Sequence, residues 1–431
     1  MRLDARAAGF EQAFTALLSA KRETDDDVNA TVAAIIADVR RRGDAALLDY
    51  TRRFDRLDIT AAGMAITAAE VDAAVARCPP DLVAALELAA ERIAAFHRRQ
   101  VPADDLYTDS AGVRLGLRWS AVGAAGLYVP GGTASYPSSV LMNAIPAKAA
   151  GVERLVMVVP TPDGVVNPAV LAAARIAGVN EIYRVGGAQA VAALAFGTET
   201  IRPVDKIVGP GNAYVAAAKR QVFGTVGIDM IAGPSEILVV ADAGNDPAWI
   251  AADLLSQAEH DTAAQSLLIT DDAAFGEAVA KAVESHLQTL SRAAIARESW
   301  EAHGAIIVVP SMEAALPLID RVAPEHLELA VDDPDAMAAK VRNAGAIFLG
   351  RYTPEALGDY VGGPNHVLPT ARSARFSSGL GVLDFMKRTT LLGCDADSLR
   401  AIGPAAVRLA EAEGLGAHLL SVALRLNPGE G

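Results

Sequence analysis

The stretch LVMVVPTPDGVVNPAVLAAARIAGVNEIYRV, residues 155–185, decides the fold class of this 431-residue chain. It begins with a continuous apolar run, continues through a segment near 168–177 with helical spacing, and ends in a second apolar run. Continuous apolar strands that alternate with helices are typical of parallel sheets covered on both faces. The same alternation extends to either side of this stretch. Helices are expected near 189–196, 213–222 and 247–259. The apolar runs between and beyond them are LYVP (127–130), KIVG (206–209), ILVV (237–240), LLIT (267–270), AIIVV (305–309) and AIFL (346–349). The sequence therefore predicts an α/β protein.

The two ends of the chain have a different pattern. Residues 5–20 are expected to form one helix and residues 28–100 several, because apolar residues recur there at helical spacing. Residues 113–119, VRLGLRW, alternate as a half-buried strand does. From about residue 381 onward we expect helix and coil.

Composition and charge narrow the class of protein. Apolar residues make up 52% and charged residues 21%, which fits a globular chain and excludes a disordered or collagen-like one. The formal net charge is −14, and an acidic chain without a basic patch repels phosphate backbones, so we expect no nucleic-acid partner. The two cysteines, Cys78 and Cys394, form no CxxC pair, which fits the reducing cytoplasm and disfavours a thiol redox site.

No segment of the sequence predicts membrane insertion. The first residues lack the apolar core of a signal peptide, since Asp4 and Glu11 interrupt them. Residues 119–147 carry no charge, but prolines and glycines such as Pro130 and Gly131 break the run, and irregular backbone does not face lipid. We expect buried strand, loop and helix there, in a cytoplasmic protein without a membrane partner.

Common nucleotide and catalytic fingerprints are absent from the sequence. GxxxxGK[ST], HExxH and GxSxG do not occur. The nearest approach to a dinucleotide fingerprint is GPGN (209–212), directly after the expected strand KIV, but Tyr214 stands where a third glycine would be. This pattern leaves both a cofactor contact and a plain tight turn open.

Two polar residues share the expected buried stripe of one helix. Asp246 and Pro247 are typical of a helix start, and Ile250 begins the buried stripe. Gln257 and His260 continue that stripe at a spacing of three residues. Because buried polar groups need partners, these side chains form either a hydrogen-bond network or half of a metal site with nitrogen and oxygen ligands.

Adjacent Glu325 and His326 lie in PEHLEL (324–329). In an extended chain their side chains face opposite ways, which suits two groups that transfer different protons. An ordinary surface pair of glutamate and histidine is the alternative.

Two later segments also collect functional side chains. Asp359 and His366 lie in the Gly/Pro-rich stretch GDYVGGPNHVLPT (358–370), and turns collect such residues for local reasons as well. Near the end of the chain, Glu413 and His418 flank a glycine-broken stretch that also resembles an ordinary helix C-terminus. Taken together, the nitrogen and oxygen donors of four residues suit zinc or manganese; they are Gln257, His260, Asp359 and His418.

The chain resembles the histidinol dehydrogenase family through motifs that run in the family's order along nearly its whole length. The matching stretches are GLYVPGG (126–132), VGGAQAVAALAFGTE (185–199), VDKIVGPGNAYVAAAKRQV (204–222), AGPSEILVVAD (232–242), DLLSQAEH (253–260), PEHLEL (324–329), GDYVGGPNHVLPT (358–370) and AEAEGLGAH (410–418). QAEH, PEH and NHVLPT are far more specific than the generic patterns above.

The resemblance implies a fold and an activity. The family oxidises L-histidinol to L-histidine through L-histidinal with two NAD, the last step of histidine biosynthesis. The implied fold is two incomplete Rossmann-like parallel-sheet domains with small helical N- and C-terminal segments, in an intertwined homodimer with shared active sites. The implied divisions are an N-terminal segment 1–24, a first domain 25–127 with 237–380, an NAD-binding domain 128–236, and a C-terminal tail 381–431 docked on the partner subunit.

The resemblance also implies roles for individual residues. One Zn²⁺ per subunit is held by Gln257, His260, Asp359 and His418, the last from the partner subunit. Proton transfer falls to Glu325 and His326. Substrate contacts are Ser235, Gln257, His260, His326, Asp359, His366, Glu413 and His418. NAD contacts are Tyr128, Gln189 and Asn212.

The chemistry of these residues is consistent with that activity. A four-electron oxidation needs two hydride transfers, with water added to the aldehyde between them. His326 suits removal of the alcohol proton, since the ordinary histidine pKa of about 6.5 lies near working pH, and Glu325 suits activation of water. The zinc is expected to hold the imidazole and amine of the substrate, and no cysteine lies beside these motifs to form a covalent intermediate.

Two other functions stay open at this point. A member of the same family turned to a different alcohol, such as a sulfonated diol, would keep most of these motifs, although Glu413 and His366 favour histidinol. A metal-binding protein without redox activity, such as a hydrolase, is the second alternative, and formation of NADH from histidinol distinguishes the two.

Overall fold

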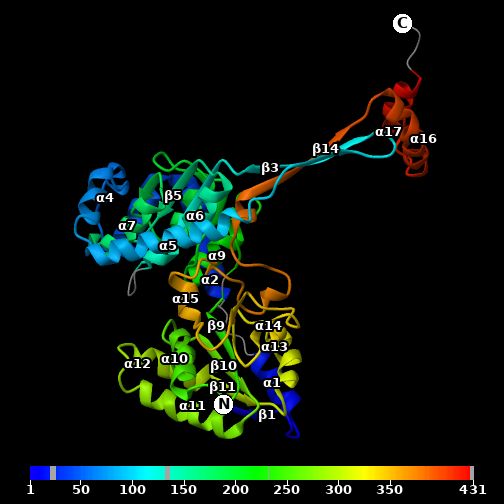
Figure 1. Ribbon diagram of the computed structural model, residues 1–431. Coiled ribbons are helices and arrows are strands. Elements are labelled where there is room, and N and C mark those ends of the chain that lie inside the picture. Colours follow the sequence, from blue (N-terminus) through cyan, green and yellow to red (C-terminus); the bar gives the residue numbers. More distant parts are fainter. Residues whose placement is uncertain (20–25, 132–135, 232, 428–431) are drawn as a thin grey trace.

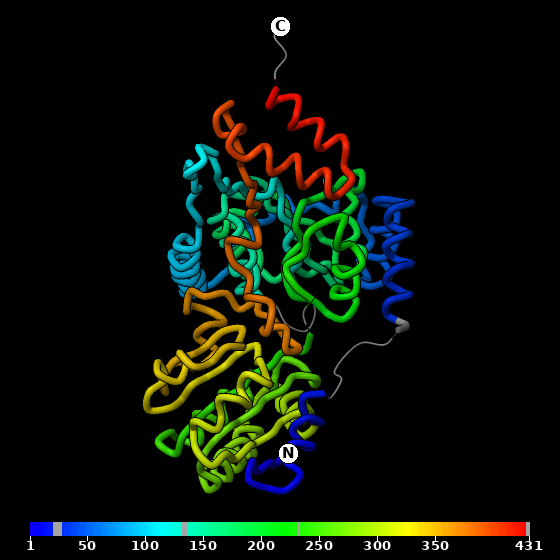
Figure 2. Tube along the Cα trace, turned by 90° about the vertical axis from the view of Figure 1, so that its right-hand side faces the viewer, coloured from blue at the N-terminus to red at the C-terminus, as the bar shows by residue number. Residues whose placement is uncertain are grey.

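The computed structural model describes residues 1–19, 26–131, 136–231 and 233–427 (Figure 1). Within these residues the strands form a six-stranded parallel sheet, a five-stranded parallel sheet and a three-stranded antiparallel sheet. Figures 1 and 2 show two α/β bodies placed end to end, with the first residues of the chain in the body of the six-stranded sheet. The predicted fold class, an α/β chain with parallel sheets and helical segments, is confirmed.

The six-stranded sheet has the order β1-β11-β10-β9-β12-β13. Its strands are β1 (Arg2–Asp4), β9 (Glu236–Ala241), β10 (Gln265–Thr270), β11 (Ala305–Val308), β12 (His326–Ala330) and β13 (Ala346–Leu349). Strands β10 and β11 lie on one side of β9, and β12 and β13 lie on the other. The chain therefore changes direction between β9 and β12, which makes the carboxyl ends of these two strands a topological switch point.

Helices cover both faces of this sheet, because successive residues of a buried strand point to opposite sides. Ile237 and Val239 share a core with α10 (Pro247–Ala258), α11 (Ala273–His286) and α12 (Ala293–His303). Leu238 and Val240 share the opposite core with α1 (Phe10–Ser19), α13 (Leu316–Val322) and α14 (Pro334–Ala338). The N-terminal segment is thus part of this body, and it contributes an edge strand as well as the expected helix.

The five-stranded sheet repeats the same topology on a smaller scale, in the order β6-β5-β4-β7-β8. Its strands are β4 (Ala124–Tyr128), β5 (Arg154–Val158), β6 (Glu181–Tyr183), β7 (Lys206–Val208) and β8 (Gly227–Ile228). The intervening helices are α6 (Pro137–Ala150), α7 (Pro168–Ile176), α8 (Gly187–Phe196) and α9 (Ala213–Val222). Here the direction changes between β4 and β7, so Tyr128 and Gly209 flank the switch point.

The helices of the N-terminal third cover the five-stranded sheet. They are α2 (Asp26–Arg42), α3 (Asp44–Tyr50), α4 (Ala68–Val75) and α5 (Pro80–Arg98). Val32 and Leu47 share a core with α8 and α9, and Val71 and Ile93 share one with α6 and α7. The expected grouping of residues 25–127 with 237–380 is therefore wrong for these helices. Periodicity shows that a helix has a buried face, but it does not show which sheet covers that face. The expected boundary at 24/25 lies outside the described residues.

The third sheet forms a long arm. Strand β3 (Arg114–Ala121) pairs antiparallel with β2 (Asp105–Thr108) and, over its full length, with β14 (Met386–Gly393). The arm projects from the five-stranded body and carries α16 (Ala396–Ala412) and α17 (Gly416–Leu426) at its far end (Figure 1). The expectation of helix and coil alone after residue 381 missed β14, because this strand depends on a partner far away in the sequence.

The described residues of the uncharged run 119–147 lie in the end of β3, in β4, in α6 and in the loops beside them, and 132–135 lie outside the described residues. Across the described ranges, none of the helices combines the length and apolar character that crossing a bilayer requires. Shorter 3₁₀ helices occupy 61–64, 162–164, 312–315, 373–375 and 382–385, and a π-helical turn occupies 51–55.

Candidate active site

A cluster of buried histidines and carboxyl groups lies at the amino end of the six-stranded sheet. A cavity of about 550 Å³ opens onto it and is lined by His326, Asp359 and His366. Arg92 and Phe96 of α5 line the same cavity. The cluster therefore lies where the two α/β bodies meet, at the end of the six-stranded sheet opposite its switch point.

His326, the first residue of β12, presents an unpaired nitrogen in this cluster. Its Nδ1 donates to the carbonyl oxygen of Glu236 at 2.9 Å, which fixes the tautomer. Its Nε2 is buried, has no hydrogen-bond partner among the described residues, and lies 3.6 Å from Oε1 of Glu355. Burial lowers the pKa of His326. The imidazole is thus neutral near pH 7, with the Nε2 lone pair available for a proton or a cation.

Glu325 is held by the backbone of Glu236, the residue that also binds His326. Its Oε2 accepts from the amide of Glu236 at 2.9 Å, and the same oxygen lies 3.7 Å from Nδ1 of His326. Burial raises the pKa of Glu325 well above its ordinary value, and the nearby charge of Glu236 adds to this. The expectation that the two side chains face opposite ways is wrong, because β12 begins at His326 and strand alternation does not extend back to Glu325.

Two carboxyl groups of the short helix α15 (Glu355–Tyr360) complete one side of the cluster. Glu355 and Asp359 are four residues apart on this helix, so their side chains lie on one face. A ligand atom from each of His326, Glu355 and Asp359 lies within 4.8 Å of the others, close enough for one metal ion to bridge them. Burial, and then the neighbouring Glu355, raise the pKa of Asp359 well above its ordinary value.

Gln257 and His260 approach from the end of α10. As predicted, Asp246 caps this helix, accepting from the amide of Ala248 at 2.8 Å. Gln257 is 2% exposed, and its Oε1 has no hydrogen-bond partner in the described part of the chain. His260 Nδ1 donates to the carbonyl of Ser256 at 2.9 Å, which selects the tautomer whose lone pair is on Nε2. Because Ser256 Oγ also donates to Glu355 at 3.1 Å, α10 and α15 are joined at the cluster.

His366 and Ser235 lie at the edge of the same region. Nδ1 of His366 donates to the carbonyl of Asp359 at 3.0 Å, and Nε2 lies 3.4 Å from Oγ of Ser139, in the first turn of α6. Burial lowers the pKa of His366 to about 4. Ser235 directly precedes β9, next to the Glu236 backbone that holds the two proton-transfer candidates.

The structure does not bring Glu413 and His418 to this cluster. Both are exposed and lie on the two helices at the far end of the arm. α17 has no buried residue, and its leucines Leu420 and Leu424 are 53% and 61% exposed. Within one chain, the predicted ligand set therefore lacks His418.

The three expected NAD contacts lie at the carboxyl end of the five-stranded sheet. Tyr128 ends β4, and its hydroxyl accepts from the amide of Gly187 at the start of α8. Gln189 lies in the first turn of α8 and is buried. Asn212 follows β7 and caps α9, accepting from the amides of the two residues after Ala213 at 3.1 and 3.2 Å. These residues surround the switch point between β4 and β7, where open α/β sheets bind nucleotides.

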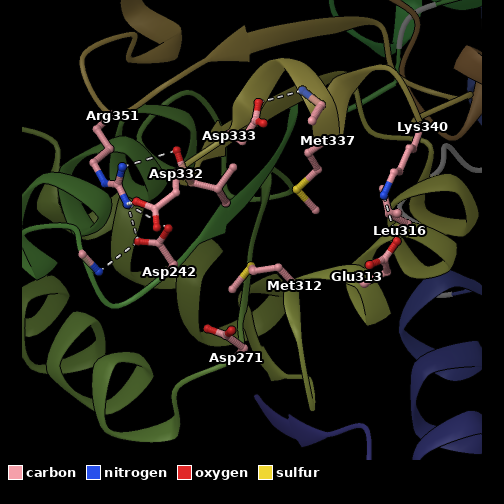
Figure 3. Close-up of a pocket in the computed structure, with 13 residues that line it drawn as sticks. Asp242, Asp271, Met312, Glu313, Leu316, Asp332, Asp333, Met337, Lys340 and Arg351 are labelled. Carbon is pink, nitrogen blue, oxygen red and sulfur yellow. Dashed lines mark hydrogen bonds and ion pairs between the residues drawn. The ribbon is translucent and has the colours of Figure 1, made fainter.

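The switch point of the six-stranded sheet has a cavity too, of about 480 Å³ (Figure 3). Both basic side chains of its lining are paired with carboxylates: Arg351 binds Asp242 and Asp332, and Lys340 binds Glu313. Its lining carries five carboxylates, on Asp242, Asp271, Glu313, Asp332 and Asp333, against two basic side chains. An excess of carboxylates repels a pyrophosphate, which makes this cavity unsuited to a dinucleotide.

The sequence analysis singled out none of three further acids near this cluster, of which two are buried and one is half-buried. One of them is Glu355. Its position four residues before Asp359 was the only feature of the sequence that could have indicated that the two carboxyl groups share one face of a helix. The others are Asp253 of α10 and Glu328 of β12, whose carboxyl groups hydrogen-bond each other. Burial raises the pKa of Asp253 to about 6 and raises the pKa of Glu328 well above its ordinary value. Two carboxyl groups at hydrogen-bond distance share a proton, and the amide of Glu355 also binds Glu328.

Replacement of Glu328 tests this protonated pair. A carboxyl group whose pKa is raised in the folded state stabilises the fold through its protonated form. This contribution is complete below the unfolded pKa of about 4.5 and is lost as the pH rises through the folded pKa. Glu328→Gln keeps the shape without the ionisation, so its melting temperature relative to the wild type should rise as the pH increases above about 5. Calorimetry in the presence of a chelator measures this, with exposed Glu87→Gln of α5 as the control. A difference that stays constant with pH would contradict the shared proton.

Comparison with known proteins now places the chain in a family. A model of the histidinol dehydrogenase family matches residues 18–426. The histidinol dehydrogenase of Rhodospirillum rubrum is 71% identical over 430 residues, covering 100% of this chain and 99% of the relative. The histidinol dehydrogenase of Rhizobium meliloti is 68% identical over 430 residues, and the match again covers 100% of this chain and 99% of the relative. A crystal structure of histidinol dehydrogenase from Elizabethkingia anophelis has a TM-score of 0.95 at 36% identity, covering 100% of this chain and 99% of that one. With a fold and a sequence that both match from end to end, the chain belongs to the histidinol dehydrogenase family.

Proposed function

We propose that this chain oxidises L-histidinol to L-histidine through L-histidinal, reducing two NAD. Its family membership makes it an NAD-dependent oxidoreductase. The observation that carries the proposal is the neutral His326, whose free Nε2 faces a cavity beside the donor set of Gln257, His260 and Asp359. The alternative substrate, a sulfonated diol, is not favoured, since the relatives above are histidinol dehydrogenases.

The first half of the reaction converts the alcohol to the aldehyde. The hydroxyl loses its proton to Nε2 of His326 as the carbon loses a hydride. The low pKa of His326 keeps this nitrogen unprotonated and therefore ready to act as a base at neutral pH. Its bond to the carbonyl of Glu236 stabilises the imidazolium that results, because Nδ1–H donates more strongly from the charged ring.

The second half requires water to add to the aldehyde, after which the hydrate loses the second hydride and becomes the carboxylate. Glu325 is assigned the activation of that water. When His326 is protonated, its positive charge lies 3.7 Å from the Glu325 carboxyl, which lowers the pKa of Glu325 and favours the ionised form that a base requires. Proton uptake by one residue thus prepares the other.

A divalent cation fits the donor set. Gln257 Oε1 is a buried oxygen without a hydrogen-bond partner among the described residues, and the Nδ1 bond of His260 selects the tautomer whose lone pair is on Nε2. The carboxyl groups of Glu355 and Asp359 lie close to each other. We assign the site to Zn²⁺, held by Gln257, His260 and Asp359 with His418 of the partner subunit. The ion would orient the imidazole and amine of the substrate. His326 is left out of this set because a metal on Nε2 would remove the base.

The nucleotide is assigned to the switch point of the five-stranded sheet, with contacts from Tyr128, Gln189 and Asn212. NAD bound there would accept the hydrides. The amide side chain of Asn212 uses its oxygen to cap α9, which leaves its N–H groups for a ligand. The Ser139–His366 contact brings the first turn of α6, also at this end of the sheet, to the substrate site.

A homodimer with shared sites is the third part of the proposal. The arm holds Glu413 and His418 away from the body of their own chain, and the exposed leucines of α16 and α17 need a cover. A second copy of the chain would supply that cover and receive these two residues at its own substrate site.

The direct test is NADH formation. Purified protein with L-histidinol and NAD should yield two NADH for each histidine formed, followed by absorbance at 340 nm and by analysis of the product. A sulfonated diol serves as the competing substrate. Absence of NADH formation from histidinol in metal-loaded protein would overturn the proposal.

His260→Asn tests the metal assignment. Loss of one nitrogen ligand should reduce zinc from about one ion per chain to less than about a tenth, as measured by elemental analysis after dialysis. His286→Asn is the matched control, because His286 of α11 lies outside the cluster and binds the carbonyl of Ala248. Stoichiometric zinc in His260→Asn would show that the ligand set is wrong.

Glu325→Gln tests the division of labour between the two proton-transfer residues. Glutamine retains the shape but cannot activate water, so aldehyde oxidation should fall by about 10² to 10⁴, and alcohol oxidation much less. Rates measured with histidinal supplied directly, compared with single-turnover rates from histidinol, separate the two steps. Equal losses in both would contradict the assignment.

Complementation tests the shared site. His260→Asn damages the body of the chain and His418→Asn damages the tail, so each homodimer should be nearly inactive. In a mixed dimer with exchanged tails, one site carries both changes and the other carries neither, so co-expression should restore activity. If each tail served its own chain, no activity would return. Co-purification of the two variants through different affinity tags first verifies that mixed dimers form.

A further inference from the structure

A buried ion pair at the end of β7 holds both backbone polar groups of one glycine. Lys219 of α9 and Asp229, which follows β8, are 3% and 0% exposed and form an ion pair. Lys219 Nζ donates to the carbonyl of Gly209 at 3.0 Å. Asp229 Oδ2 accepts from the amide of Gly209 at 2.8 Å. The opposite charges therefore bind opposite ends of the same residue.

Gly209 is placed where no other residue fits. Its φ is 114°, in the region that only glycine adopts readily, and a Cβ there would lie 2.2 Å from the carbonyl oxygen of Tyr128. The backbone after β7 thus touches the backbone at the end of β4, across the switch point of the sheet. Any shift of Gly209 would move the GPGN loop and its Asn212 relative to Tyr128.

Stability alone does not account for this pair. Removing two charges from water costs about as much as their attraction returns, so an apolar pair of similar size would serve a core equally well. What an apolar pair does not supply is a fixed donor and a fixed acceptor for the Gly209 backbone. Fixed geometry at the loop is therefore what the ion pair contributes.

We propose that Lys219 and Asp229 are positioning residues for the nucleotide: they hold the GPGN loop in the geometry that receives NAD. The proposal rests on the assignment of NAD to this switch point. It makes Lys219 and Asp229 act through Gly209 and Asn212, without contact with the dinucleotide, and independently of the substrate and metal site.

The test replaces the ion pair by apolar residues, in Lys219→Met/Asp229→Leu. Because both charges are removed together, no unpaired charge is left in the core. The Gly209 amide and carbonyl do lose their partners, so the melting temperature should fall moderately, and binding is measured at a temperature where both proteins are fully folded. The dissociation constant of NADH, measured by fluorescence titration, and the KM for NAD should each rise by about tenfold, the scale of one charge-assisted hydrogen bond. The kcat at saturating NAD, the KM for histidinol and the zinc content should stay near the wild-type values.

A matched control removes another ion pair from the same sheet. Arg154 and Glu181 pair at 2.7 Å at the amino ends of β5 and β6, away from the GPGN loop. Arg154→Met/Glu181→Leu should leave the NADH dissociation constant unchanged. Equal effects of the two double variants would show general loosening of the sheet and would overturn a positioning role.

Two further measurements keep the outcomes distinct. Asn212→Ala should weaken NADH binding if the nucleotide lies at this switch point. If Asn212→Ala weakens binding and the apolar pair does not, the positioning proposal fails alone; if neither weakens binding, the assignment of the nucleotide site fails. Hydrogen exchange of the Gly209 amide can be measured in the wild type. Slow exchange is expected because this amide binds Asp229, and exchange as fast as that of an unstructured loop would overturn the proposal.

Discussion

The backbone of Glu236 holds both side chains that we propose for proton transfer, Glu325 and His326. Its amide binds Glu325 and its carbonyl binds His326, and both bonds depend on the parallel pairing of β9 with β12, in which His326 lies beside Ile237. That pairing exists only because the chain crosses over after β11 and returns to the other side of β9. The topology of the sheet therefore sets the tautomer of the base and the 3.7 Å separation that couples the two titrating groups.

The two parallel sheets share a topology but use opposite ends. In the five-stranded sheet the switch point carries Tyr128, the glycine loop and two helix starts, features that accept a dinucleotide. In the six-stranded sheet the switch point is lined by carboxylates, and the functional cluster lies at the other end. Since α6 begins at the carboxyl end of the five-stranded sheet and Ser139 in its first turn contacts His366, the proposed nucleotide end of one sheet faces the proposed catalytic end of the other. Hydride donor and acceptor can then meet between the bodies.

Much of this arrangement could be predicted from local pattern. The strand–helix alternation predicted parallel sheets, and the spacing of Gln257 and His260 on the buried stripe of one helix predicted their meeting at a buried site. Glu355 was missed because α15 is a six-residue helix in a Gly/Pro-rich segment, too short for an apolar period to reveal which face is buried. Asp253 and Glu328 were missed because acids are ordinarily solvated; only the fold shows that they bury each other. The assignment of α2–α5 to a sheet, and the strand β14, depend on partners distant in the sequence, and no local pattern encodes them.

Under the proposed ligand set, the arm leaves a single chain with a complete fold but an incomplete site. Its two outer helices pack on each other, but they are amphipathic, and the apolar side chains left exposed include Leu409, Leu420 and Leu424. Exposed apolar area of this kind drives association, because burying it removes about 25 cal/mol per Å² of unfavourable contact with water. The ribbon of β2, β3 and β14 places that area, together with Glu413 and His418, beyond the body of its own chain. The same apolar surface that would drive dimer formation would thus deliver the fourth metal ligand, so that assembly and completion of the site become one step.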